Sequence, residues 1–304
     1  MIDCRDEGGS YVLQCDEGGF RDIVGAEQHL PALTRAQASL IRQLLRDKRT
    51  RSREKAFVLE GIKSCLDLIY RYPRSILSLI VSPRFLCAEA EAARRARMTL
   101  PARQFVCSDA GFDKLTDVEM PQGILAVVRQ PAWDEVQIFG RTSALGIYGD
   151  RLQDPANVGA IIRTAAALNL SGVWLSADSA DPFSPKVVRA TAGTILSIPV
   201  FHPRDFRAFS SYGCEIYSTV LASADMVPIR NIRTIPGRLM IAVGNEGAGL
   251  APDVVKASSI RFFIPLAEGV ESLNVAATAA ISAFYFSGLR LDSGVGSTRS
   301  RRSA

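Results

Sequence analysis

Three short segments in the second half of the chain combine polar side chains with glycine in ways suited to positioning a reacting group. The first, residues 152–164, reads LQDPANVGAIIRT. Asn157 is suited to cap the helix that begins here, and Gly159 lets a ligand or another backbone come close. Arg163, six residues after Asn157, is a permanent cation. Alone, the pattern also fits an ordinary capped helix with an arginine on its exposed face.

The second segment, residues 244–250 (GNEGAGL), directly follows an apolar run at 239–243. Glycines at the carboxyl end of a strand mark the place where an open α/β sheet binds ligands. Glu246 adds a carboxylate that accepts hydrogen bonds. The spacing differs from the Rossmann and Walker loops, which disfavours a nucleotide-binding enzyme of another class. A glycine-rich turn without a ligand fits this segment equally well.

The third segment, residues 264–278, contains the end of a strand at Ile264, a loop, and the start of an alanine-rich helix. Ser272 or Asn274 is expected to cap that helix, because either side chain can accept hydrogen bonds from the first backbone amides. Capping is the simplest interpretation, and the small residues that follow suit close packing against a neighbouring element.

The surrounding pattern predicts a parallel α/β domain. Strands are expected at 144–148, 173–176, 215–220, 239–243 and 261–264, and helices at 157–168, 185–194 and 274–286. These strands lack the strict alternation of a half-exposed sheet, which is typical of a parallel sheet covered on both faces.

The first half predicts a second, smaller α/β domain. Thr34 is a suitable cap for a helix with apolar residues at helical spacing. Strands are expected at 57–59, 76–81, 104–107 and 123–129, and helices at 61–70, 89–97 and 110–115. The chain therefore divides into a flexible leader (1–30), a first domain (31–130), a linker (131–140), a second domain (141–290) and a disordered tail (291–304).

Composition argues against several classes of protein. Hydrophobic residues make up 47% of the 304, enough for two cores, and no apolar run reaches the roughly 20 residues that cross a bilayer. The six cysteines form no CxxC pair and the two histidines lie far apart, so a metal site, a disulfide framework and a histidine triad are not expected. The start has no signal pattern, and we expect a cytoplasmic protein.

Positive charge is concentrated in one place. The chain carries a net charge of +5, and residues 46–55 (RDKRTRSREK) hold six basic and two acidic residues, a net charge of +4. A solvated helix face is the common explanation of such a run. The alternative is a surface that contacts phosphate groups, formed by Arg46, Lys48, Arg49, Arg51 and Arg53.

Together and in this order, the three segments resemble the SpoU/TrmH family of SPOUT methyltransferases. The family motifs N-V-G-x-x-x-R-T, G-x-E-G-x-G and I-P followed by S-L-N-V match residues 157–164, 244–249 and 264–275. Residues 186–193 (KVVRATAG) resemble the family's basic segment, and 57–61 (FVLEG) the start of its substrate-binding domain. The resemblance covers roughly residues 33–290.

The resemblance implies a trefoil-knotted catalytic domain, preceded by an L30e-like RNA-binding domain and acting as a homodimer. It implies S-adenosylmethionine as cofactor, held mainly by backbone, and RNA as partner, with Lys186 and Arg189 among the RNA-binding residues. The reaction would methylate a ribose 2′-hydroxyl, a group that DNA lacks. The cofactor-binding residues implied are Gly244, Ile264 and Leu273, with Leu221 and Gly249 beside them.

Family analogy places Arg163 at the reacting hydroxyl. Because a guanidinium is effectively always protonated, we expect Arg163 to hold the target phosphate and stabilise developing alkoxide charge rather than to act as a base. The residues expected to orient Arg163 and the ribose are Asn157, Glu246, Ser272 and Asn274.

Two alternatives stay open. One is a catalytically inactive RNA-binding protein of the same fold, and the other is a related SPOUT enzyme that methylates a base nitrogen. The two-domain layout favours ribosomal RNA over tRNA as the substrate, by resemblance alone.

Overall fold

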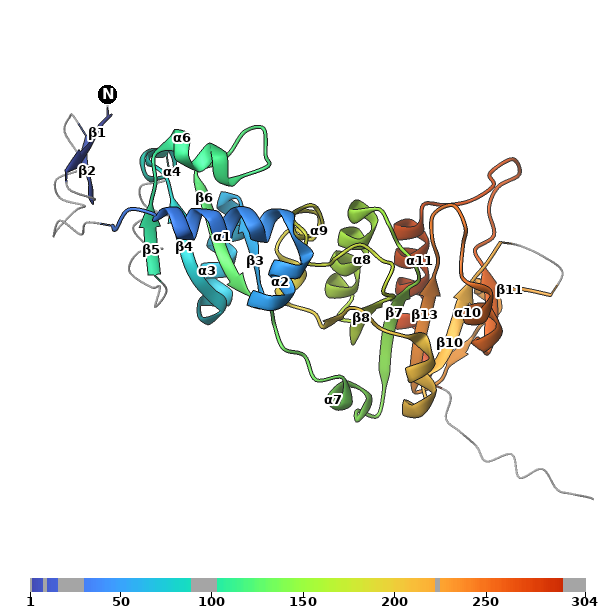
Figure 1. The fold of residues 1–304 in the computed structure, drawn as a ribbon. Coiled ribbons are helices and arrows are strands. Elements are labelled where there is room, and N and C mark those ends of the chain that lie inside the picture. Colours follow the sequence, from blue (N-terminus) through green and yellow to red (C-terminus); the bar gives the residue numbers. More distant parts are fainter. Residues whose placement is uncertain (1, 8–9, 16–29, 89–102, 222–224, 292–304) are drawn as a thin grey trace, which may run out of the picture. The chain divides into compact units, whose positions relative to one another are not determined.

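The protein is described by a computed structural model that covers residues 2–7, 10–15, 30–88, 103–221 and 225–291. It forms two compact units (Figure 1). Unit 1 contains residues 1–132 and 181–196, and unit 2 contains residues 133–180 and 197–304. The helix expected at 89–97 and the tail at 292–304 lie outside the described residues.

An antiparallel pair of strands lies near the start of the chain, where a flexible leader was expected. β1 (Ile2–Glu7) pairs with β2 (Ser10–Cys15) in antiparallel register. In a sequence, two glycines between short runs of strand-forming residues are a hairpin signal, which the expectation of a flexible leader did not use. Residues 16–29 are not described.

Unit 1 is built on a four-stranded mixed sheet of order β3-β6-β4-β5. Only the β4–β5 pair is parallel. All four strands were expected, and their ends differ from expectation by at most one residue. The strands are β3 (Ala56–Glu60), β4 (Ile76–Val81), β5 (Arg103–Val106) and β6 (Ile124–Arg129).

The helices of unit 1 begin at residues whose side chains satisfy the first backbone amides. Thr34 caps α1 as predicted. Its hydroxyl oxygen accepts from the Gln37 amide, and the Gln37 side-chain oxygen accepts from the Thr34 amide, which forms a capping box. Asp47 ends α1 and caps α2, so the basic run is helical. The helical elements are α1 (Arg35–Arg46), α2 (Lys48–Glu54), α3 (Ile62–Arg71), η1 (Pro73–Ser75), α4 (Pro83–Ala88), α6 (Asp109–Phe112) and η2 (Asp113–Leu115).

Residues 181–196 belong to unit 1, although they lie between two strands of unit 2 in the sequence. This segment contains α9 (Pro185–Ala190) and η3 (Thr194–Leu196). Arg51 forms an ion pair with Asp181 at 2.7 Å, and both side chains are largely buried. The rings of Phe57 and Phe183 lie 5.2 Å apart. A helix expected for the catalytic domain therefore packs as part of the other unit.

Unit 2 is built on a parallel sheet of order β11-β14-β10-β13-β7-β8-β9. The expected parallel sheet is confirmed, and the short strands β9 and β11 were not predicted. The strands are β7 (Ala144–Gly149), β8 (Gly172–Leu175), β9 (Val200–Phe201), β10 (Glu215–Thr219), β11 (Val227–Pro228), β13 (Arg238–Val243) and β14 (Ile260–Phe263). A separate parallel pair joins β12 (Thr234–Ile235) to β15 (Arg290–Leu291).

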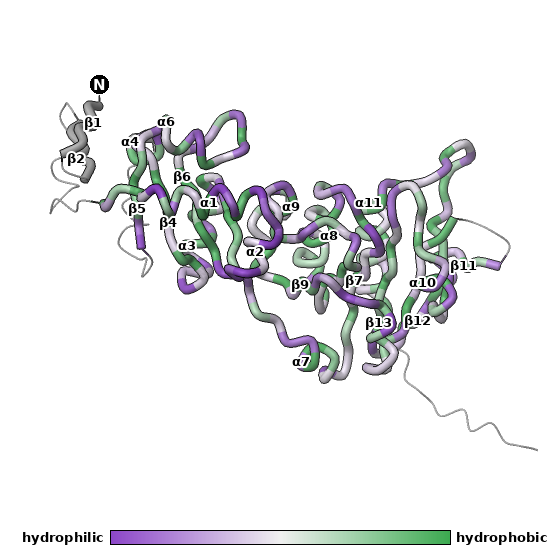
Figure 2. Tube along the Cα trace, viewed as in Figure 1, coloured by the Kyte–Doolittle hydropathy of each residue, from purple (hydrophilic) through white to green (hydrophobic). Residues whose placement is uncertain are grey.

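Both faces of this sheet are covered, as the apolar strands predict. Figure 2 shows the green, hydrophobic stretches of β7 and β13. Helices α8 (Pro155–Ala167) and α11 (Val275–Ser287) pack against one another and against β7. Side chains of the opposite face, such as Tyr148 and Trp174, share a core with Phe139 and Phe209. The elements supplying the opposite cover are α7 (Glu135–Phe139), η4 (Phe206–Tyr212) and α10 (Pro252–Ala257), while η5 (Ile229–Asn231) follows β11.

The segment expected as a linker therefore contains a packed helix. Ile138 and Phe139 of α7 are buried in the core of unit 2. Asp134 caps α7 by accepting hydrogen bonds from the amides of Val136 and Gln137. The helix is only one turn long, and tertiary burial rather than periodicity stabilises it.

The buried pair between Arg51 and Asp181 gives a stability prediction. Arg51→Met leaves a buried carboxylate without its partner, so we expect the free energy of unfolding to fall by about 3–5 kcal/mol. Urea titration measures the loss. Arg53→Met is the matched control, because its pair with Glu54 is exposed and should contribute under about 1 kcal/mol. Equal losses of unfolding free energy in the two variants would show that the buried pair does not stabilise the packing of residues 181–196.

Candidate active site

A chain of three hydrogen-bonded side chains links helix α11 to the glycine loop after β13. The Asn274 side-chain oxygen accepts from the amides of Ala276 and Ala277 at 2.8 and 3.3 Å. Its Nδ2 donates to Asn157 Oδ1 at 2.9 Å, and Asn157 Nδ2 donates to Glu246 Oε1 at 2.9 Å. The helix amides fix which end of Asn274 is the donor, and this fixes the orientation of Asn157 in turn.

This chain corrects one expectation and confirms another. Of the two residues expected to cap α11, Ser272 and Asn274, it is Asn274 that caps the helix. Asn157 is not a cap: Asp154 caps α8 by accepting from the amide of Ala156, and Pro155 occupies the first turn. The signal in the sequence was aspartate directly before proline, because proline favours the first helical position. Asn157, 7% exposed, is thereby free to bond to Glu246.

The loop at residues 244–250 folds back on itself at Gly244. A Cβ at Gly244 would lie 2.2 Å from the backbone nitrogen of Leu250, so no side chain fits there. Asn245, which was not among the residues selected from the sequence, accepts from the amides of Gly247 and Ala248 through its Oδ1. An asparagine two residues before a glycine in a loop is a turn signal that could have identified it.

The carboxylate of Glu246 is stabilised in its charged form. Partial burial alone would raise the pKa of Glu246, but hydrogen bonds from Asn157 and from the backbone of Gln153 and Asp154 outweigh it and lower the pKa. A carboxylate held in this way accepts hydrogen bonds and orients donors. It is not suited to supply a proton near neutral pH.

The expected cofactor residues lie at one edge of the sheet. Strands β14, β10 and β13 are adjacent and parallel, so the positions after them share that edge. Leu221 follows β10, Gly244 follows β13, and Ile264 follows β14. Leu221 is 72% exposed, and this apolar side chain at the edge could cover part of a bound ligand.

The remaining two residues predicted to bind the cofactor differ in what surrounds them. Gly249 has a φ of +66°, and apart from its chain neighbours no atom lies within 4 Å of the position of a Cβ, so there is open space beside its Cα, while its own N–H and C=O are bonded to Asn245. Leu273 is half-buried in the stretch before α11. The loop is therefore tightly folded at Gly244 and leaves open space beside Gly249, against which a ligand could pack.

The structure does not join every predicted catalytic residue to this chain. Arg163 is exposed on α8, and its side chain makes no hydrogen bond or ion pair within the part of the chain that is described. It lies about 9 Å further along the helix axis than Asn157, at 1.5 Å per residue. Ser272 is exposed before α11. Asn157, Glu246 and Asn274 therefore form the assembled part of the site.

The predicted RNA-binding residues separate into two groups. Arg51 is 5% exposed and donates to the carbonyl oxygen of Leu44 besides pairing with Asp181, so it is withdrawn from the set. Arg189 is exposed and pairs with Asp117. Figure 2 shows α2 as hydrophilic. The other residues of the set are exposed on α1, α2 and α9, and they are Arg46, Lys48, Arg49, Arg53 and Lys186.

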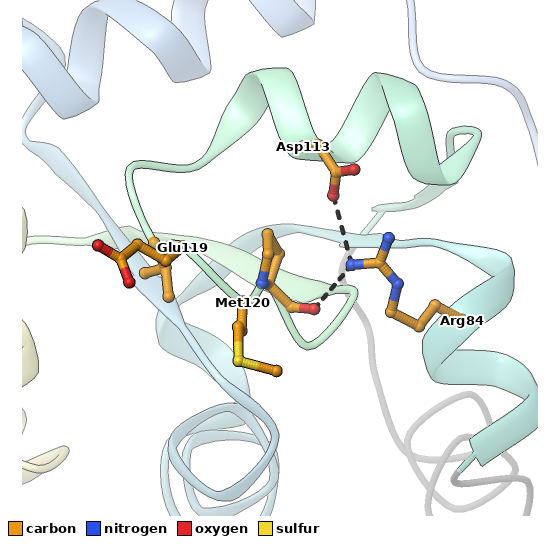
Figure 3. A pocket seen from close by; sticks show the side chains of 6 residues that line it. Arg84, Asp113, Glu119 and Met120 are labelled. Carbon is orange, nitrogen blue, oxygen red and sulfur yellow. Dashed lines mark hydrogen bonds and ion pairs between the residues drawn. The ribbon is translucent and has the colours of Figure 1, made fainter.

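A separate hollow of about 560 Å³ lies in unit 1. Figure 3 shows Arg84 bonded there to Asp113 and to the carbonyl oxygen of Pro121, at 3.3 and 2.9 Å. This charge already has partners, and none of the predicted site residues lines the hollow. The lining residues are Arg84, Asp113, Val118, Glu119, Met120 and Pro121.

Two family models match this chain in the order of its units. The SpoU rRNA Methylase family matches residues 144–284, and the MRM3-like substrate binding domain matches residues 40–126. An uncharacterized tRNA/rRNA methyltransferase of Synechocystis sp. is 33% identical over 60% of this chain and 67% of its own length. The chain belongs to the SpoU methylase family.

Other members of the SpoU family match over most of the chain. The 23S rRNA (guanosine(2553)-2′-O)-methyltransferase RlmP of Bacillus subtilis is 29% identical over 80% of this chain and 93% of its own length. The SpoU methyltransferase AviRb of Streptomyces viridochromogenes, solved in complex with the cofactor AdoMet, superposes with a TM-score of 0.72. It is 25% identical and covers 83% of this chain and 97% of its own. The resemblance inferred from the three motifs is confirmed.

The chain from Asn274 to Glu246 gives a prediction that separates capping from catalysis. Asn274→Asp keeps an oxygen for the cap, so stability should change by less than about 1 kcal/mol. It removes the amide donor to Asn157, so Asn157 must turn and its bond to Glu246 breaks. Methyl transfer should fall about tenfold or more, as expected from losing a bond of about 1.4 kcal/mol.

Thermal unfolding and transfer rates measure the two effects of Asn274→Asp. Asp205→Asn, at the cap of η4, is a matched exchange of the same two side chains away from the site, and it should leave transfer unchanged. A normal transfer rate in Asn274→Asp would mean that the orientation of Asn157 is unimportant.

Proposed function

We propose that this protein transfers a methyl group from S-adenosylmethionine to a ribose 2′-hydroxyl in RNA, with ribosomal RNA as the substrate. The observation that carries the proposal is the hydrogen-bonded set of Asn157, Glu246 and Asn274 at the ligand-binding edge of a SpoU-family sheet. RlmP, which matches most of this chain, is named for 2′-O-methylation of 23S rRNA.

The cofactor would lie against the backbone at the ends of β10, β13 and β14. Gly244 keeps the loop closed, and the missing side chain at Gly249 leaves open space beside the loop. Leu221 and Leu266, 72% and 37% exposed, are apolar side chains available to cover the ligand. When bound, the sulfonium of S-adenosylmethionine supplies an activated methyl group. The neighbour AviRb, solved with AdoMet, supports this choice of cofactor.

The side chains of the site orient the nucleophile and stabilise charge. A ribose hydroxyl is a weak nucleophile, so charge that develops on its oxygen needs a nearby cation. Arg163 is the candidate, because a guanidinium is a cation and this side chain has no partner within the described residues. Glu246 and Asn157 are held in fixed orientations and can direct the arginine and the ribose. Alignment of the hydroxyl accounts for much of the expected rate enhancement.

We further propose a homodimer in which both copies shape the site. Among the described residues of one chain, the Arg163 side chain is not connected to the Asn157–Glu246 pair, so a second copy could bring an arginine to the reaction. Exposed apolar side chains on α11, Ile281 and Phe284, offer a surface for this association. A trefoil knot in unit 2 and a cytoplasmic location belong to the same proposal. Within the part of the chain that is described, no helix has the length and apolar character needed to span a bilayer.

RNA would be held by the exposed basic residues of α2 and α9. Both helices belong to unit 1, and the Arg51–Asp181 pair joins α2 to the start of the α9 segment. Lys48 and Lys186 are exposed there, and a chain of phosphates would complement their charge. The match of residues 40–126 to a substrate binding domain supports this role.

The experiment that tests the function is methyl transfer from labelled S-adenosylmethionine to ribosomal and transfer RNA, with the product nucleosides identified. We expect 2′-O-methylated nucleoside in ribosomal RNA. Arg163→Ala should lower transfer at least about a hundredfold, the range of one charge-stabilising group, without weakening cofactor binding. A base-methylated product would assign another SPOUT activity. The absence of both transfer and cofactor binding would favour an inactive RNA-binding protein.

The RNA surface gives a separate prediction. Lys48→Glu should weaken RNA binding and reduce the dependence of log K on log salt by roughly 0.7–0.9 for each phosphate that the protein no longer neutralises, the range between single-stranded and duplex nucleic acid. Filter binding at several salt concentrations measures both quantities. Lys114→Glu is the control, since Lys114 is exposed in the same unit on η2. Equal effects of the two variants would indicate only a general charge effect.

A further inference from the structure

Arg151, directly after Asp150 at the end of β7, has a backbone conformation that arginine rarely adopts. Its φ is +54°, in the left-handed region that favours glycine, asparagine and aspartate. Such strain persists where the surroundings hold the residue firmly, and it is concentrated at functional sites. Arg151 is not among the catalytic, cofactor or RNA-binding residues selected from the sequence.

Two side chains hold the backbone of Arg151. Its amide donates to Ser176 Oγ at 2.7 Å, and its carbonyl oxygen accepts from Asn245 Nδ2 at 2.9 Å. The second bond connects Arg151 with the first part of the glycine loop at residues 244–250. The left-handed conformation is therefore maintained by bonds that also fix Asn245.

The side chain of Arg151 reaches the far end of the same loop. Its Nη2 donates to the carbonyl oxygen of Gly249 at 3.0 Å, and its Nε lies 3.2 Å from Asp150 Oδ2. Asp150 is 4% exposed, and its carboxylate accepts from the amide of Ala251 at 2.8 Å. Asp150 and Arg151 thus bond to the loop at Asn245 and Gly249 and to Ala251 directly after it.

We propose that Arg151 is a positioning residue that holds the 244–250 loop in its cofactor-binding conformation before the cofactor binds. The inference rests on the proposed function, because it takes this loop as the binding site of S-adenosylmethionine. A loop that is ordered in advance binds its ligand more tightly, since less conformational freedom is lost on binding. The guanidinium acts through Gly249 and Asp150, and no contact with substrate is required.

Arg151→Asn tests this role with little risk to the fold, because asparagine tolerates the left-handed backbone. The variant loses the bond to Gly249 and the charge beside Asp150. We expect the dissociation constant for S-adenosylmethionine, measured by calorimetry, to rise about tenfold, as for the loss of one charged hydrogen bond. In the protein without cofactor, amide hydrogen exchange at Gly247, Ala248 and Gly249 should become at least about tenfold faster.

Two further variants separate positioning from general damage. Arg151→Gly fits the backbone best and should show the same losses, so a failure of one variant to fold leaves the other informative. Arg204→Asn removes an arginine that pairs with Glu135 elsewhere in unit 2, and it should change neither cofactor affinity nor exchange in the loop.

The two measurements decide the proposal together. Unchanged exchange in the loop of Arg151→Asn overturns it, even if cofactor affinity falls, because Arg151 would then act by direct contact. Unchanged affinity with faster exchange also overturns it, since loop order would not matter for binding. If the wild-type protein bound no S-adenosylmethionine, the proposed function would fail, whereas the exchange comparison would still report whether Arg151 orders the loop.

Discussion

Parallel pairing of β14, β10, β13 and β7 is the constraint on which the organisation of unit 2 depends. In a parallel sheet, all strands end at the same edge, so the loops that follow neighbouring strands lie next to one another. Leu221, Gly244 and Ile264 are far apart in sequence, and each lies just after one of these strands. Cover on both faces stabilises the sheet and leaves this edge for binding.

Helix ends complete the edge with groups of fixed orientation. The side-chain oxygen of Asn274 accepts a hydrogen bond from the first turn of α11, and its side-chain nitrogen donates one to Asn157. Because one amide performs both tasks, the stability of the helix start and the orientation of Glu246 are linked. The bond from Asn157 also helps to lower the pKa of Glu246 despite partial burial, so the carboxylate is kept in its charged form at this edge of the sheet.

The buried pair of Arg51 and Asp181 shows how residues of the SpoU segment become part of the substrate-binding unit. The segment 181–196 leaves after β8 and returns before β9, and it packs with β3 through Phe183 and α9. An arginine counted among basic surface residues in the sequence is therefore a structural residue. Its neighbours Lys48 and Arg49 remain exposed on α2, which leaves the surface with less charge than the sequence suggests.

Most of the longer strands and helices, and the family, could be predicted from the sequence alone. Apolar runs such as 76–81 and 239–243 are long enough, and bounded clearly enough, that their strands follow from local pattern. Three ordered motifs identified the SpoU resemblance, Thr34 was recognised as a cap, and Asn274 was one of two cap candidates, because capping depends on neighbours along the chain. One-turn helices such as α7 were missed, since their stability comes from burial and leaves no periodicity to detect.

Which polar residues meet could not be predicted from the sequence, because it depends on how distant segments pack. Whether Asn157 caps a helix or bonds to Glu246, 89 residues away in the chain, depends on how two strands and a helix pack. The same is true of Arg51, whose burial results from a partner 130 residues away, and of Arg151, whose strained backbone is held by Ser176 and Asn245. Residue type gives the possible partners, and folding brings one of them within hydrogen-bond distance.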